Sequence, residues 1–151
     1  IHALACNIQP EGKLTVVSAS LQATMSLSGN ENIDIIQLGG MLRHSSASVV
    51  GQYSMEFLRG CSFSKLFLGV DGIDVDFGIS TTDIREAELN RAMMQAAQKT
   101  IVLADSSKFG RRGFAKISGM EDIDTIITDA KIPHAVAKRI EEMGIDLIIA
   151  G

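Results

Sequence analysis

The 151-residue sequence contains only two cysteines, two prolines and no tryptophan. Two cysteines are too few for the disulfide framework of a small secreted domain, and Cys6 and Cys61 match none of the paired spacings of metal sites. We expect both to be small buried hydrophobic residues. The low proline content, with 46% hydrophobic and 21% charged residues, is typical of a folded globular domain rather than a disordered segment.

Long apolar runs are absent as well. No run approaches the ~20 residues that a membrane helix needs, and the segment from Ile1 to Ala5 lacks the charged and cleavage regions of a signal peptide. The net charge is −4 and the pI is about 5.3, which opposes a negatively charged phosphate backbone. We therefore expect a cytoplasmic protein without a membrane partner, and a chain that does not bind DNA by itself.

The common cofactor and catalytic motifs are missing too. There is no glycine loop ending in Gly-Lys-Ser/Thr and no Gly-x-Gly-x-x-Gly, and Gly69-Val-Asp-Gly72 fits neither pattern. Without a Gly-x-Ser-x-Gly elbow, a serine hydrolase would lack its nucleophile. The histidines are scattered, without carboxylate or cysteine neighbours at ligand spacing: His2, His44 and His134. We expect neither a cofactor nor a metal.

Short apolar runs alternate with helical patterns along the chain. The runs lie at Leu14–Val17, Ile33–Leu38, Phe63–Val70, Thr100–Ala104, Asp124–Ile127 and Asp146–Ile149. They are continuous rather than alternating, as in strands that are covered on both faces. This order predicts an α/β fold, a doubly wound and mostly parallel sheet with helices on both faces. No linker or repeat divides the chain, so we expect one domain over residues 1–151.

Three segments between these runs have helical periodicity. Core-facing helices are predicted around Val50 to Leu58, from the spacing of Val50, Tyr53, Phe57 and Leu58, and around Val136 to Met143, between Pro133 and Gly144. The most regular helix spans about Asp83 to Gln98, and its apolar stripe is formed by Leu89, Ala92, Met93, Ala96 and Ala97.

The entrance of the helix from Asp83 carries charges on the face that should be buried. One turn before Leu89, both Arg85 and Glu86 lie on the apolar stripe, and buried charges need a partner. One explanation is a capping box formed by Asp83 and Glu86. The other is a polar pocket at the helix entrance. The sequence leaves both open.

Polar and small residues follow most of the predicted strands. Ligands of open parallel sheets bind beyond the carboxyl ends of the strands, where small residues let a ligand approach and hydroxyls, amides and a lysine can meet an anion. Each such residue alone also fits an ordinary turn, so only their convergence predicts an anionic, hydroxyl-rich ligand. In the basic stretch from Lys108 to Arg112, Lys108 is the candidate anion contact; Arg111 and Arg112 fit a solvated loop as well.

Five segments carry a family resemblance. They are Leu14-Thr-Val-Val-Ser18 with Ser20-Leu21, Gln37-Leu-Gly-Gly-Met-Leu-Arg43, Phe67-Leu-Gly-Val-Asp-Gly-Ile-Asp74, Glu86-Ala87 and Leu103-Ala-Asp-Ser-Ser-Lys-Phe-Gly110. In order and spacing they resemble the sensor domain of DeoR-family repressors over nearly the whole chain. The most diagnostic feature is Asp-Ser-Ser-Lys-Phe-Gly in register with Asp-Gly-Ile-Asp.

The resemblance implies a fold like ribose-5-phosphate isomerase, glucosamine-6-phosphate isomerase and CoA transferase. It also implies a repressor of carbohydrate genes that a phosphorylated sugar regulates. On general grounds we expect a homo-oligomer, a symmetric dimer or tetramer. The implied ligand-binding residues are Ser18, Ser20, Gly39, Gly40, Arg43, Asp71, Gly72, Glu86, Asp105 and Lys108.

Two departures from the family pattern bear on the ligand. The family usually has Thr-Asn-Ser/Asn where this chain has Ser18-Ala19-Ser20, so a side-chain amide is lost and the ligand is expected to differ. Family members also carry a winged helix-turn-helix domain and a strand ending in a Ser-Gly-Thr-Thr-like turn before the helix that Ile1 to Ala5 resembles. The resemblance thus implies an effector-binding domain that lacks both parts, with operator DNA bound only through the N-terminal domain.

Two other functions remain as alternatives. An aldose-ketose isomerase on the same fold would use Asp71, Asp74, Glu86 and Lys108 as acid, base and phosphate groups, and fold alone does not separate it from a repressor. Isomerases carry a glycine-richer segment where this chain has Gly78-Ile-Ser-Thr-Thr82, which favours the regulator and predicts no enzymatic activity. A purely structural oligomerisation domain would leave the polar residues at the strand ends unexplained.

Overall fold

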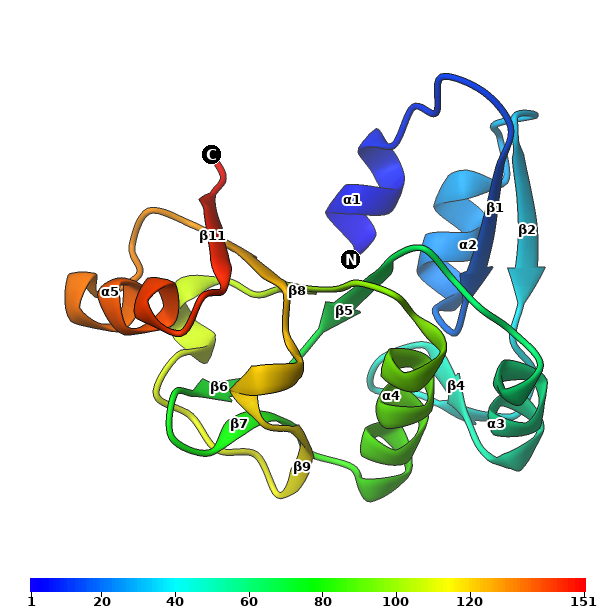
Figure 1. Ribbon diagram of the computed structural model, residues 1–151. Coiled ribbons are helices and arrows are strands. Elements are labelled where there is room, and N and C mark those ends of the chain that lie inside the picture. Colours follow the sequence, from blue (N-terminus) through cyan, green and yellow to red (C-terminus); the bar gives the residue numbers. More distant parts are fainter. The chain divides into compact units, whose positions relative to one another are not determined.

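The computed structural model describes residues 1–151 as two compact units, Ile1–Phe57 and Leu58–Gly151 (Figure 1). All six predicted strands are present, each within a few residues of its predicted bounds, and each pairs in parallel with at least one neighbour. The α/β class is therefore confirmed. The two units are described in turn, and the interpretation of residues 1–151 as one sensor domain stays a prediction.

The first unit is built on a β-α-β segment. Its elements are α1 (His2–Asn7), β1 (Leu14–Ser18), α2 (Leu21–Leu27), β2 (Ile33–Gln37), β3 (Met41–Arg43), β4 (Ser48–Val50) and the greater part of α3 (Gln52–Arg59). β1 and β2 pair in parallel from Leu14 with Ile33 to Ser18 with Gln37. Parallel neighbours need a crossover, and α2 provides it. The small core of this unit is formed by Ala5, Ala23, Leu27 and Ile33.

The hairpin of β3 and β4 depends on one glycine. Gly40 has a φ of +148°, and a Cβ there would lie 2.4 Å from the carbonyl oxygen of Val50. Only glycine permits this backbone and this close approach. The hairpin is fixed to the turn before α2, because the N–H of Leu21 donates to Ala47 O and the N–H of Val49 donates to Ala19 O, both at 2.9 Å.

The second unit contains a four-stranded parallel sheet in the order β11-β10-β8-β5. Its strands are β5 (Leu66–Gly69), β8 (Thr100–Leu103), β10 (Thr125–Thr128) and β11 (Asp146–Ile149). Ile126 and Val102 are fully buried in its centre. The strand order follows the chain in one direction, without the reversal that marks a doubly wound sheet. A single doubly wound sheet for the whole chain therefore stays a prediction.

Five short antiparallel strands were not predicted. Besides β3 and β4 they are β6 (Gly72–Asp74), β7 (Gly78–Thr81) and β9 (Ala115–Ser118), which form a sheet in the order β6-β7-β9. Strands of three or four residues are too short to show the period of two by which strands are recognised. β7 also buries polar groups, since Ser80 and Thr81 are 0% and 1% exposed. From the sequence alone, serine and threonine residues such as these are typical of a turn.

The helices of the second unit were predicted with mixed success. α5 (His134–Glu142) begins after Pro133 and ends before Gly144, as predicted, although Met143 is exposed. α4 (Ile84–Ala96) buries Leu89 as predicted, but Ala92, Met93 and Ala96 are only half-buried. Its other fully buried positions are Ala87 and Asn90. The short 3-10 helices η1 (Ser106–Lys108) and η2 (Met120–Asp122) complete the unit.

Two expectations about buried side chains were wrong. Tyr53 and Phe57 of α3 are 79% and 41% exposed, whereas Ser54 and Leu58 are buried. Ser54 can be buried because its hydroxyl donates to the Gly39 carbonyl at 2.5 Å. Cys6 is exposed and Cys61 half-buried, so neither is a core residue. In the six-residue α1, Ala5 occupies the buried position and Cys6 faces outward.

None of the helices combines the length and the apolar character that crossing a lipid bilayer requires.

Truncation of Ile126 tests the core of the four-stranded sheet. Ile126 is 0% exposed in β10, whereas Ile148 in β11 is 49% exposed. Ile126→Ala should lower the free energy of unfolding by ~2–5 kcal/mol because it removes buried apolar surface and leaves a cavity. Ile148→Ala should lower it by less than ~1 kcal/mol. Urea titrations followed by circular dichroism measure both, and equal losses would contradict this packing.

Candidate functional site

Three aspartates follow neighbouring strands of the four-stranded sheet at the same position. In the register of the sheet Gly69 pairs with Leu103, and Leu103 pairs with Ile127. Two residues beyond these three come Asp71, Asp105 and Asp129. Because parallel strands end at one edge, this register brings the predicted site residues Asp71 and Asp105 to the same edge as Asp129. Asp129 was not among the predicted site residues.

The turn that carries Lys108 is built by two of these aspartates. Asp105 caps η1 by accepting from the backbone N–H of Ser107 at 2.8 Å and from the Ser107 hydroxyl. Asp129 accepts from the backbone N–H of Ser106 at 2.7 Å. Hydrogen bonds from Ser107 lower the pKa of Asp105, and the Ser106 and Lys131 N–H groups lower the pKa of Asp129. Both carboxylates therefore stay ionised while they hold the turn.

Lys108 ends η1 and is half-buried. The chain after it runs along β6, where the N–H of Gly110 donates to Ile73 O at 2.8 Å. A Cβ on Gly72 would lie 2.5 Å from the carbonyl oxygen of Arg111, and one on Gly113 would lie 2.6 Å from that of Thr81. Glycine at both positions lets this segment pack against the hairpin of β6 and β7. The observed role of Gly72 is thus close backbone packing.

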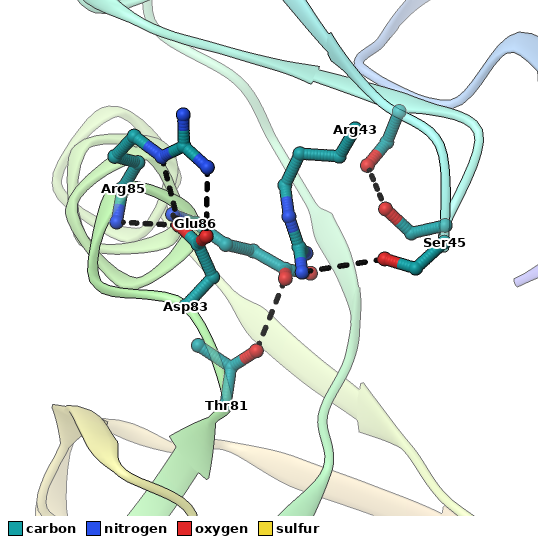
Figure 2. Close-up of polar contacts among 8 residues, drawn as sticks. Arg43, Ser45, Thr81, Asp83, Arg85 and Glu86 are labelled. Atoms are coloured by element: carbon teal, nitrogen blue, oxygen red, sulfur yellow. Dashed lines mark hydrogen bonds and ion pairs between the residues drawn. The ribbon is translucent and has the colours of Figure 1, made fainter.

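A buried threonine connects the predicted residues Asp71 and Glu86. Thr81, at the end of β7, is 1% exposed, and its hydroxyl oxygen lies 2.8 Å from Asp71 Oδ2 and 3.1 Å from Glu86 Oε2. Figure 2 shows Thr81 directed at the Glu86 carboxylate. We call Asp71, Thr81 and Glu86 the Thr81 cluster. Sequence patterns missed Thr81, because a threonine in Gly78-Ile-Ser-Thr-Thr82 carries no motif of its own.

The entrance of α4 has the predicted cap at Asp83. The Asp83 side chain accepts from the N–H groups of Arg85 at 2.8 Å and Glu86 at 3.2 Å, and its carboxylate also pairs with the Arg85 guanidinium at 2.9 Å (Figure 2). The hydrogen bond from Arg85 contributes most to lowering the pKa of Asp83 to about 2. The cap at Asp83 is confirmed and Glu86 also contacts Thr81, whereas a polar pocket at the helix entrance stays a prediction.

Asp74 and Arg112 form an ion pair beside this region. Arg112 Nε lies 2.9 Å from Asp74 Oδ2, and the N–H groups of Asp76 and Phe77 donate to the same carboxylate, each at 2.9 Å. The Arg112 hydrogen bond is the main reason that the pKa of Asp74 falls to about 2. Asp74 is thus a structural acceptor in the β6–β7 turn, which disfavours it as the proton-transferring group of an isomerase.

The five predicted residues of the first unit have local roles there. Ser18 Oγ accepts from the N–H of Ser20 at 3.0 Å, and Ser20 Oγ caps α2 by accepting from the N–H of Ala23 at 3.2 Å. The Gly39 carbonyl accepts from Ser54, and Gly40 holds the β3–β4 hairpin. Arg43 Nη2 donates to Ser45 Oγ at 3.4 Å (Figure 2). Their contact with a ligand stays a prediction.

An open hollow of ≈ 710 Å³ lies at the carboxyl edge of the four-stranded sheet, lined by residues 105–107, residues 129–131 and Gly151. It shares Asp105 to Ser107 with the Lys108 turn, so this edge combines concavity with polar groups. No group of three or more His, Cys, Asp or Glu side chains is arranged to hold a metal ion.

The segments that carry these strand-end residues match a known protein family. The family model of the DeoR C-terminal sensor domain matches residues 1–130. The chain belongs to the DeoR family. It is 36% identical over 135 residues to an HTH-type transcriptional regulator, YulB, of Bacillus subtilis, covering 89% of this chain and 52% of that protein. Over 138 residues it is 38% identical to a protein named for repression of the aga operon in Escherichia coli O157:H7, covering 91% and 49%.

A glycerol-3-phosphate regulon repressor of Escherichia coli K12 is 27% identical over 146 residues, which cover 97% of this chain and 58% of the repressor. The sensor domain thus spans about half the length of these transcriptional regulators. The resemblance seen in the sequence is confirmed at the level of the family and of transcription regulation.

Removing Arg112 tests the Asp74 ion pair of the sensor domain. In Arg112→Gln the pKa of Asp74 should rise from about 2 toward its ordinary value of 3.8, because the main hydrogen bond to the carboxylate is lost. The wild-type pair stabilises the fold above pH 3.8 and loses this effect as the pH falls toward 2, so the variant should show a smaller loss of stability over that interval. NMR titration of the Asp74 carboxyl and acid unfolding measure both effects. The neighbouring exposed Arg111→Gln is the control, and an equal pKa change there would contradict the assignment.

Proposed function

We propose that this sensor domain binds a phosphorylated sugar and that binding changes the affinity of the regulator that contains it for DNA. The observation that carries the proposal is the carboxyl edge of the four-stranded sheet. There the segment after Lys108 is bonded to β6, because the N–H of Gly110 donates to Ile73 O. Asp71 of the Thr81 cluster directly precedes β6. A cation and a pair of carboxylates near one sheet edge suit a ligand with both a phosphate and hydroxyl groups.

Each part of this edge has a distinct chemical task. The Lys108 ammonium pairs with the phosphate, since lysine is a mobile point charge that meets phosphate oxygens from several directions. The carboxylates of Asp71 and Glu86 accept hydrogen bonds from sugar hydroxyls. Asp105 and Asp129 hold the Lys108 turn through backbone N–H groups, and their pKa values are lowered by those bonds. Contact of the residues predicted in the first unit, among them Ser18 and Arg43, with the ligand stays a prediction.

The names of the relatives point to the same class of ligand. One is named for the glycerol-3-phosphate regulon, and glycerol 3-phosphate is a phosphorylated polyol. The sensor domain itself is acidic, with a net charge of −4, so DNA binding is assigned to another part of the regulator. Coupling between an effector site and a DNA site typically amounts to ~1–3 kcal/mol. The proposed assembly is a symmetric homo-oligomer.

Catalytic turnover is not expected. The relatives are named as regulators and repressors, and Asp74, which an isomerase would need as an acid or base, is held in an ion pair. Incubation with ribose 5-phosphate or glucosamine 6-phosphate should therefore give no conversion above a protein-free control, measured by NMR or coupled assay. Saturable turnover that Glu86→Gln abolishes would replace the regulator by the isomerase.

The Lys108 ammonium should determine the affinity for sugar phosphates. Hydrogen bonds that involve a charged group contribute ~1.5–3 kcal/mol, so Lys108→Ala should weaken binding roughly 10-fold to 100-fold. With a ligand at about 100 times its dissociation constant, the wild type gains ~2.7 kcal/mol, which raises Tm by roughly 5–10 °C. Thermal shift with glycerol 3-phosphate, ribose 5-phosphate and glucosamine 6-phosphate measures this.

The control for this experiment is Lys65→Ala. Lys65 is exposed and precedes β5, at the amino ends of the strands, so its removal changes the net charge equally without touching the carboxyl edge. The unphosphorylated sugars should shift Tm in none of the proteins. Equal shifts in wild type and Lys108→Ala would remove Lys108 from the site, and no shift with any sugar phosphate would contradict the proposed function.

A further inference from the structure

Two buried polar atoms have no hydrogen-bond partner, the hydroxyl oxygen of Thr128 in β10 and the amide nitrogen of Asn90. Asn90 of α4 is 4% exposed, and its amide nitrogen, Nδ2, has no hydrogen-bond partner. Buried amide groups are nearly always paired, because an unpaired donor loses its bonds to water without replacement. An orphaned donor in a family of ligand-binding domains therefore calls for a partner from outside the fold.

The position of Asn90 places it near the Thr81 cluster. Asn90 follows Glu86 by four residues in α4, so the two lie on one helix face one turn apart. The Cα–Cβ bonds of a helix tilt toward its N-terminus, which leans the Asn90 side chain toward the turn that carries Glu86. Glu86 in turn contacts Thr81, whose hydroxyl also bonds Asp71. The orphaned donor thus lies one helical turn from a group of carboxylate acceptors.

The surroundings of Asn90 would suit an apolar side chain. Ala87, one turn earlier, belongs to the main core of the second unit, and Met93 and Met94, one turn later, pack against it. A leucine would bury no unpaired polar group at this position. The amide therefore destabilises the free domain, which is the pattern of a residue kept for a function rather than for folding.

We infer that Asn90 is a specificity-determining residue of the effector site, whose Nδ2 donates a hydrogen bond to an oxygen of the carbohydrate part of the ligand. Hydroxyl groups both donate and accept hydrogen bonds. The carboxylates of the Thr81 cluster accept from them, and the Asn90 amide donates to them. Lys108 serves the phosphate. This inference rests on the proposed function, and it divides the site into a phosphate half and a hydroxyl half.

The division is tested with three probes on the whole chain: glycerol 3-phosphate, glucosamine 6-phosphate and inorganic phosphate. Asn90→Leu should weaken at least one of the two organic phosphates roughly 10-fold and change the affinity for inorganic phosphate less than about 2-fold. Lys108→Ala should weaken all three. NMR titration gives the dissociation constants. Asn90→Ala repeats the loss of the donor without the added bulk of leucine, and Gln95→Leu, at an exposed amide of the same helix, is the matched control.

The free protein provides a second measurement. Asn90→Leu should raise the Tm of the ligand-free chain by roughly 2–4 °C, because it removes an unpaired buried donor. Higher stability shows that the amide is unpaired in the free chain, and weaker organic phosphate binding in the same variant supports the inference.

The outcomes separate the two proposals. If Lys108→Ala weakens binding but both Asn90 variants bind the organic phosphates as the wild type does, the effector site stands and the role of Asn90 is overturned. Equal losses for inorganic and organic phosphates in both Asn90 variants would show a general disturbance of the fold and overturn it as well. If the wild type binds none of the organic phosphates, the proposed function fails, and the inference about Asn90 falls with it.

Discussion

The parallel pairing of β8 with β5 on one side and β10 on the other is the constraint on which the candidate site depends. This register puts Asp71, Asp105 and Asp129 two residues beyond paired positions, on one edge of the sheet. The register thereby brings side chains from three distant stretches of sequence to one edge of the sheet. A shift of one residue in either pairing would move an aspartate off that edge and turn its strand's buried face outward.

An edge with several carboxylates can still receive an anion, because its charges are engaged differently. Asp105 and Asp129 accept backbone N–H groups and thereby shape the turn that ends at Lys108. The Thr81 hydroxyl bonds Asp71 and approaches Glu86 from a buried position. The carboxylates thus hold the turn or face hydroxyl partners, and in the proposed function the ammonium of Lys108 meets the phosphate.

Sequence patterns predicted the parts of this fold that are long and apolar, and missed those that are short or polar. Runs such as Thr100–Ala104 are continuous and buried, so their strands were predicted almost to the residue. β6 and β7 have three and four residues, and Ser80 and Thr81 are buried only because hydrogen bonds satisfy them. Tyr53 was predicted to be buried but is exposed, because helical spacing alone does not tell which face of the helix packs against the core. Thr81 and Asn90 carry no motif, and only the three-dimensional contacts reveal them.

α4 joins the candidate site to the core of the second unit. Asp83 caps the helix by accepting from the N–H of Glu86, and the Glu86 carboxylate contacts Thr81. Ala87 and Leu89, which follow in the same helix, are buried. A ligand changes a conformational equilibrium only through a difference in affinity between states. The strands of the sheet are held by backbone hydrogen bonds that a ligand at their ends does not reach. In the proposed function, ligand binding changes the partners of groups at the entrance of α4. A signal from the site would then begin in the packing of this helix against β7 and β9.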